Sequence, residues 1–148
     1  MCLIIDINIA HKALLTDSDP DFSIVYACLF TGKPYKARLV YGGKKFLEEL
    51  AKNNAVISII AALDRAGKAI KIDDNSVDEE EQKIAASGLC TSNDEHIIAL
   101  ARVANVRLLC SHDQALHVDF TDKKLLDTPR GKVYQDTTHK DLLRRFCK

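Results

Sequence analysis

Short apolar runs alternate with longer amphipathic segments along this chain, and the two patterns predict different elements. Four runs are short and rich in apolar, often branched side chains, which favours buried strands; they are residues 2–5, 69–73, 107–110 and 132–135. Residues 37–41 are either a further strand or an extended link, and Gly42-Gly43 ends them. Runs this apolar are typical of parallel strands that are covered on both faces.

Segments with apolar positions three and four residues apart predict helices between these strands. They are residues 7–15, 21–30, 44–52, 56–66, 77–87 and 140–147, a capped helix from Ser92 to the turn at Asn105, and one or two turns over 114–120. The segment 56–66 is apolar almost all round, so we expect a mostly buried helix there. Strands that alternate with helices predict an α/β fold, a three-layer α/β/α sandwich around a central parallel sheet, in a single domain over residues 1–148.

Acidic residues stand at the carboxyl ends of two predicted strands. Asp6 closes the first strand and Asp113 follows the strand at 107–110. Asp94 begins the helix that leads into that second strand, so it belongs to the same edge of the sheet, where parallel α/β folds bind ligands. Taken alone, Asp94 reads as a helix cap beside Ser92; beside Asp6 and Asp113 we favour a shared site.

A fourth acid comes from the helix at 44–52, where Glu48 and Glu49 are adjacent. Only one of them can point inward, because neighbours on a helix are about 100° apart. Several carboxylates in one pocket repel one another unless a cation lies between them, and carboxylate oxygens suit Mg²⁺ or Mn²⁺. The pattern therefore predicts metal-dependent hydrolysis of a phosphodiester. We expect His96 to be a satisfied packing histidine. Asp119 and Asp122 either extend the acid cluster or are exposed loop acids.

Charge and cysteine content limit the binding partners and the cellular compartment that we expect for this chain. Lysine and arginine number 21, as do aspartate and glutamate, so net charge alone predicts no strong attraction to nucleic acid. Basic side chains near the predicted site are candidates for a phosphate rim or ordinary surface charges: Lys12, Arg38, Lys44 and Lys45. Five cysteines without a CxxC spacing argue against disulfides and zinc, and favour reduced thiols in the cytoplasm. No signal peptide and no apolar run of about 18 residues is present, so we expect no membrane association.

Four stretches, taken together and in order, resemble the motifs of the PIN domain family. They are Ile4-Ile5-Asp6-Ile7-Asn8-Ile9, Phe46-Leu47-Glu48-Glu49-Leu50, Asp94-Glu95-His96-Ile97-Ile98-Ala99-Leu100-Ala101 and Leu108-Leu109-Cys110-Ser111-His112-Asp113. The resemblance implies an α/β/α nuclease whose metal-site acids are Asp6, Asp94 and Asp113. It favours Glu49 over Glu48, because the family motif places its acid directly before a leucine, and it makes Asn8 and Ser111 supporting residues.

The function implied by this resemblance is a Mg²⁺- or Mn²⁺-dependent endoribonuclease that acts on an RNA substrate. Many bacterial PIN proteins are toxins, so an antitoxin protein is an expected partner, and PIN proteins often form a homodimer. The alternative is a PIN-like module that binds nucleic acid or regulates without hydrolysing anything. A small-molecule phosphatase ranks last, because Asp6-Ile7-Asn8 lacks a second aspartate two residues after the first.

Overall fold

Parallel strands form the centre of the structure, a computed structural model that describes residues 1–147. The strands are β1 Ile4–Ile5, β2 Leu39–Gly42, β3 Ala69–Ile72, β4 Leu108–Cys110 and β5 Lys132–Tyr134. One sheet has the order β1-β4-β5 and the other pairs β2 with β3, all in parallel. A parallel bridge between Leu3 and Leu39 joins the two sheets, which gives the order β3-β2-β1-β4-β5. The segment that was either strand or link is therefore a strand.

Helices connect the strands at nearly the predicted positions. They are α1 Ala10–Leu14, α2 Ser23–Phe30, α3 Lys44–Leu50, α4 Asn54–Arg65, α5 Asp74–Ser87, α6 Glu95–Ala104, α7 Gln114–Phe120 and α8 Lys140–Phe146. Two 3₁₀ turns, η1 Ile7–Ile9 and η2 Thr137–His139, precede α1 and α8. Helix α5 begins three residues before the predicted start, because Asp73 caps it by accepting a hydrogen bond from the backbone N–H of Ser76.

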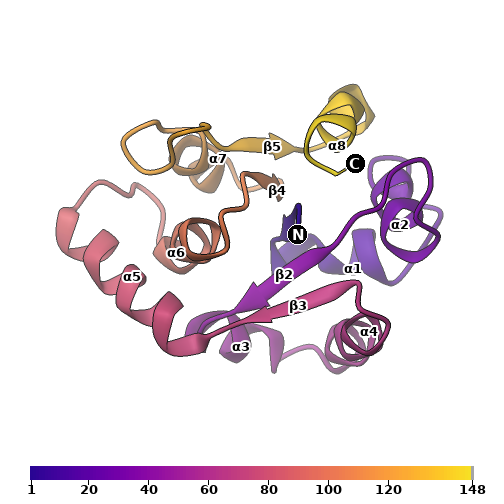
Figure 1. Cartoon of the computed structure of the whole chain (residues 1–148), viewed down its shortest axis with the longest axis horizontal. Coiled ribbons are helices and arrows are strands. Elements are labelled where there is room, and N and C mark those ends of the chain that lie inside the picture. Colours follow the sequence, from indigo (N-terminus) through magenta and orange to yellow (C-terminus); the bar gives the residue numbers. More distant parts are fainter. Residues whose placement is uncertain (148) are drawn as a thin grey trace.

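Apolar side chains gather on both faces of the strands. Successive strand residues point to opposite faces, and accordingly Leu3 and Ile5 belong to one buried cluster while Ile4 belongs to the other. The first cluster contains residues of α1, α2, α4 and α8, and the second contains residues of α3, α5, α6 and α7. Figure 1 shows these helices flanking the strands on two sides. The prediction of an α/β fold with parallel strands is confirmed.

Burial of two helices differs from the sequence pattern. Helix α4 is not mostly buried: only Val56, Ile60 and Leu63 are buried in it, and Ile57 is exposed. Helix α6 is buried over most of its length, because α5 covers the side that faces away from the strands (Figure 1). The run that is apolar almost all round is therefore the partly exposed helix α4, whereas α6, which follows Asp94, is buried over most of its length.

Gly42 and Gly43 shape the turn between β2 and α3. Their φ angles are 142° and 92°, a region that side-chain-bearing residues rarely adopt. A Cβ on Gly43 would lie 2.6 Å from Cγ1 of Val77, so α5 can approach this turn only because the side chain is absent. The backbone N–H of Gly43 donates to Oδ1 of Asp74 at 2.9 Å. This turn fixes the start of α3, the helix that carries Glu49.

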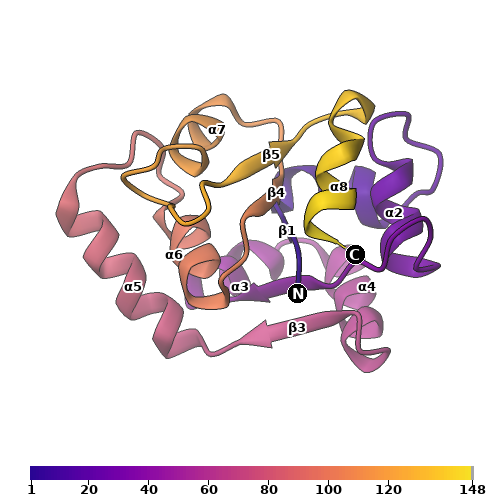
Figure 2. The same cartoon turned by 45° about the horizontal axis from the view of Figure 1, so that its top comes forward.

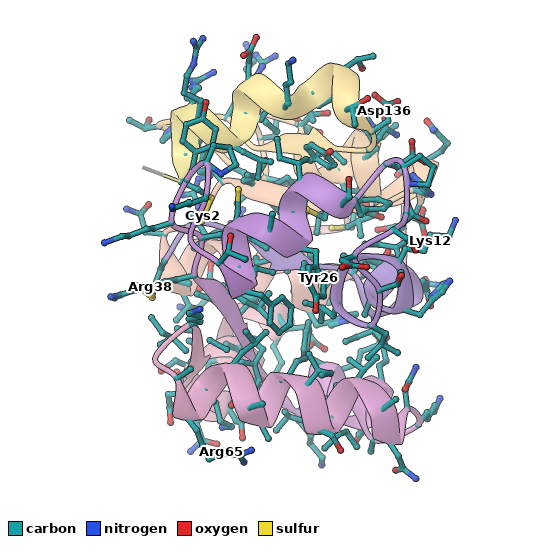
Figure 3. The ribbon with its side chains drawn as sticks, turned by 90° about the vertical axis from the view of Figure 1, so that its right-hand side faces the viewer. Cys2, Lys12, Tyr26, Arg38, Arg65 and Asp136 are labelled. Carbon is teal, nitrogen blue, oxygen red and sulfur yellow. A yellow bond between two sulfur atoms is a disulfide. The ribbon has the colours of Figure 1, made fainter. Side chains whose placement is uncertain are left out.

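The two ends of the described chain are joined by a disulfide between Cys2 and Cys147. The cysteine spacing argued against disulfides, and this pair contradicts that prediction, because α8 returns past the start of β1 and brings the two Cα atoms within 5.3 Å. Figure 2 shows the ends of the chain near each other, and Figure 3 shows Cys2 below α8. Cysteine content thus no longer supports a reducing compartment, and a cytoplasmic location stays a prediction. Within residues 1–147, no helix has both the length and the apolar character needed to cross a membrane.

Candidate metal centre

Asp6 and Asp113 lie at the ends of the adjacent strands β1 and β4, as the sequence predicts. Ser111 links them: its hydroxyl donates to Oδ2 of Asp6 at 2.9 Å and accepts the backbone N–H of Asp113 at 3.0 Å. Oδ1 of Asp6 accepts the backbone N–H of Asn8 at 3.2 Å, and Oδ1 of Asp113 caps α7 through Leu116. Ser111 therefore supports both acids, whereas Asn8 contributes its backbone and leaves its side chain exposed.

Asp94 occupies the N-cap position of α6 but makes no side-chain capping hydrogen bond. The simple helix-cap interpretation is therefore wrong, and this carboxylate is not committed to its own helix. Another acid holds the segment just before it: Asp119, which is 1% exposed, accepts hydrogen bonds from Ser92 and Thr91. Asp119 is thus a buried anchor and not an exposed loop acid, which was one of the two alternatives that the sequence left open.

Glu49 is the member of the glutamate pair that faces the other acids. Ligand atoms of Glu49, Asp94 and His96 all lie within 4.8 Å of one another. Glu48 is exposed and lines a groove of about 490 Å³ between α3 and α5. Phe46 is buried in the second apolar cluster and Leu50 in the first. These two contacts fix the rotation of α3, so that Glu49 points inward.

The carboxylates disturb one another's ionisation. Burial, followed by the charges of Asp6, Asp113 and Glu49, raises the pKa of Asp94 to about 6, while Lys45 opposes the rise. Burial also raises the pKa of Asp6, against the hydrogen bonds from Ser111 and Asn8. The charges of Asp6, Asp113 and Glu49 therefore all act on Asp94, and Ser111 links Asp6 to Asp113 by hydrogen bonds.

His96 is the residue that sequence reasoning missed. Its side chain is fully buried, and neither ring nitrogen has a hydrogen-bond partner within the described residues. Nε2 lies 3.5 Å from Oε2 of Glu49. Burial, helped by Lys45, lowers the pKa of His96 to about 4, so the ring is neutral at pH 7 and the contact is no ion pair. The available signal was its position two residues after Asp94 on a buried helix.

A divalent cation fits this donor set. Half-buried carboxylates that raise one another's pKa are stabilised by a positive charge between them. Glu49 and Asp94 offer oxygen atoms, and His96 offers an uncommitted nitrogen, within one small volume. The chain therefore carries a carboxylate and histidine cluster that is able to bind a metal ion, and the identity of that ion is a separate question.

Of the basic residues considered from the sequence, Lys45 lies beside this centre. Its Nζ donates to the backbone carbonyl of Asn93 at 2.8 Å, and its charge lowers the pKa of both Asp94 and Glu49. Lys12 and Arg38 lie on opposite sides of the face shown in Figure 3, so these two residues do not form one rim with each other.

The remaining histidine near a predicted acid is structural. Nε2 of His112 lies 2.8 Å from the carbonyl of Gln135, and its ring packs on Phe22.

Comparison of the chain with protein-family models, with curated proteins and with solved structures finds no match. Any functional conclusion therefore rests on the site itself.

Proposed function

We propose that this chain is a PIN-type, divalent-metal-dependent endoribonuclease. The observation that carries the proposal is that Glu49 and Asp94 lie in one group within 4.8 Å, while Ser111 links Asp6 and Asp113 at the carboxyl ends of β1 and β4. Open parallel sheets bind ligands at this edge. The ordered four-motif resemblance supports the choice of a nuclease among metal-dependent hydrolases.

In this proposal Asp6, Asp94 and Glu49 hold the cation, directly or through water. When bound, such an ion lowers the pKa of a water molecule and offsets the charge of a phosphodiester. Asp113 is the fourth acid of this set: one of its oxygens caps α7, and its charge acts on Asp94. Ser111 fixes the orientation of Asp6 by donating to Oδ2. Carboxylates fixed in this way position the reacting groups without forming a covalent intermediate.

RNA is the proposed substrate because of the resemblance, and local charge is compatible with it. The chain has no net charge, so non-specific attraction is weak and binding depends on local cations such as Lys45. Lys45 contacts the loop just before Asp94, and in this proposal its charge attracts a phosphate of the RNA backbone. An antitoxin partner and a homodimer remain proposals that rest on the family resemblance.

The adjacent glutamates provide the test. Cleavage of a generic single-stranded RNA is measured for wild type, Glu48→Gln, Glu49→Gln and Asp94→Asn. The Mn²⁺ concentration is about 1 to 5 mM, roughly the order at which weak metal sites fill. We expect Glu49→Gln and Asp94→Asn to lower the rate at least about 100-fold. Glu48→Gln should keep wild-type activity, since its side chain is exposed and faces away from the centre.

Equal cleavage by wild type and Asp94→Asn would refute the proposal, because the activity would then come from elsewhere or from a contaminant. If the wild type binds Mn²⁺ at this centre and cleaves no RNA under any metal condition, the alternative of a non-hydrolytic binding module is correct instead. Metal binding is followed by calorimetry with Asp6→Ala as the reference that lacks one acid of the centre.

A further inference from the structure

His96 is as buried as a core residue, but its ring nitrogens lack the hydrogen bonds that buried polar groups usually make. It is fully buried on α6, yet both ring nitrogens lack a partner within residues 1–147. Buried polar groups are nearly always hydrogen-bonded, so each exception requires an explanation. In the same chain His112 contacts the carbonyl of Gln135 and Nδ1 of His139 accepts the backbone N–H of Gln135. Those two histidines have hydrogen-bond partners, and His117 leaves one buried nitrogen unpaired, whereas His96 leaves both of its ring nitrogens unpaired within the described residues.

The orphaned nitrogen is close to atoms that bind cations. Nε2 of His96 lies 3.5 Å from Oε2 of Glu49, and a carboxylate oxygen of Asp94 completes a group within 4.8 Å. Two neighbouring ligand atoms on one six-coordinate ion are separated by roughly 3 Å. The separation from Glu49 is therefore close to that of two ligands of one ion, whereas it lacks the geometry of a hydrogen bond.

We propose that His96 is a nitrogen ligand of the cation and that, through it, the centre selects a first-row transition ion over Mg²⁺. This inference rests on the proposed metal-dependent function and adds the identity of the metal class. An all-carboxylate pocket suits Mg²⁺, which prefers oxygen ligands and keeps several waters. An imidazole ligand favours softer ions of the series from Mn²⁺ to Zn²⁺, because nitrogen binds them better than it binds Mg²⁺.

Position on the helix makes this role specific to His96. It follows Asp94 by two residues at the start of α6, and α3 brings Glu49 to the same spot from a distant part of the sequence. Ring and carboxylates therefore come from two elements that the core holds rigidly, since Ile97 and Ile98 beside His96 are buried. A ligand on such a scaffold keeps its position when the ion binds.

Electron spin-echo spectroscopy on Mn²⁺ tests the proposal, because modulation from a coordinated imidazole ¹⁴N is independent of catalytic activity. The full chain loaded with Mn²⁺ is compared with His96→Gln and with His117→Gln. His117 is the matched control, since its Nδ1 is also buried without a partner but it does not belong to the carboxylate group. We expect ¹⁴N modulation in wild type and His117→Gln and its loss in His96→Gln.

Affinities measured by calorimetry give the second readout. His96→Gln should weaken Mn²⁺ binding by about 10-fold or more and change Mg²⁺ binding by less than about 3-fold. If His96→Gln does not fold, ¹⁵N-histidine labelling of wild type identifies a histidine ligand. Glutamine variants of the other histidines then assign it by elimination; they are His11, His112, His117 and His139.

Two results would overturn the inference, and only the second would also refute the proposed metal-dependent function. Mn²⁺ that binds at this centre without ¹⁴N modulation shows an all-oxygen site, which refutes the role of His96 and leaves the proposed nuclease intact. If neither Mn²⁺ nor Mg²⁺ binds in a way that Asp6→Ala or Asp94→Asn abolishes, the metal-dependent function fails together with the inference.

Discussion

Removing the charge of Asp94 should stabilise the metal-free protein while it abolishes the proposed activity. The pKa of Asp94 rises from its ordinary 3.8 to about 6, first because of burial and then because of Asp6, Asp113 and Glu49. A raised carboxyl pKa means that the folded state binds the proton more tightly than the unfolded state. Stability is therefore highest below pH 3.8 for this group, falls as the pH rises, and reaches its full loss above about 6.

The size of the effect follows from the same shift. At about 1.36 kcal/mol for each pH unit, the change from 3.8 to about 6 sets an upper bound of about 3 kcal/mol at pH 7.5, which solvent screening of this half-buried group lowers. Asp94→Asn keeps the shape of the side chain, and no capping hydrogen bond is lost because Asp94 makes none. For a domain of this size we expect a rise in Tm of up to about 10 °C in EDTA.

Urea denaturation and calorimetry at pH 4.5 and 7.5 measure the difference in stability between wild type and Asp94→Asn, about 1.5 pH units on either side of the pKa of about 6. The variant should be more stable at the higher pH, and the gap should narrow at the lower one, where Asp94 is protonated. Glu79→Gln, on the exposed face of α5, is the control and should change stability by less than about 0.5 kcal/mol. Saturating Mn²⁺ should stabilise wild type by about 2.7 kcal/mol at 100 times Kd and the variant much less.

A variant that is no more stable than wild type at pH 7.5 would refute the reasoning, because the acids would then not repel one another in the folded state. An equal gain at both pH values would also refute it, since the gain would then come from packing and not from charge.

Three further predictions concern residues around the centre. Ser111→Ala removes the hydroxyl that donates to Asp6, so Mn²⁺ affinity by calorimetry should fall about 10-fold while the fold by circular dichroism is kept; unchanged affinity would show that Ser111 has no orienting role. Cys147→Ser removes the disulfide to Cys2, which closes a loop across a separation of 145 residues. By the chain-entropy model such a bond stabilises the folded protein by up to about 5 kcal/mol, so the urea midpoint of the variant should fall to that of the wild type kept in reductant. Asp119→Asn should lower the free energy of unfolding in urea by about 3 kcal/mol. Burial opposes the ionisation of Asp119, but several hydrogen bonds to its charged form lower its pKa, so the loss should shrink as the pH falls below 3.8.

Periodicity predicted most of the elements because each local rule was satisfied by the residues concerned. The expected helix over 114–120 coincides with Gln114–Phe120, and the expected strand over 69–73 ends one residue earlier, at Ile72. Periodicity failed on burial: the helix Asn54–Arg65 is apolar almost all round yet largely exposed. Whether an apolar face is covered depends on which helix lies outside it, and the sequence of one helix does not contain that information.

The acids show the same division. Asp6 and Asp113 were predictable because parallel strands end at a common edge, whatever the rest of the fold does. Glu49 and Glu48 were indistinguishable by periodicity, because two adjacent residues of one helix differ only by a rotation that packing decides. The rotation is set by the apolar contacts of α3, and Glu49 faces Asp94 as a result.

By itself, the sequence determined the alternation of strands and helices, the acidic edge and the order of its motifs, since these depend on residues close together in the chain. Only the tertiary structure decided the pairing of Cys2 with Cys147 and the placing of His96, without a partner, beside Glu49. Both are contacts between segments far apart in the chain, and such contacts exist only after the core has fixed where each segment lies. The candidate metal centre combines the two: its aspartates follow from local rules, whereas the orientation of Glu49 and the position of His96 come from long-range packing.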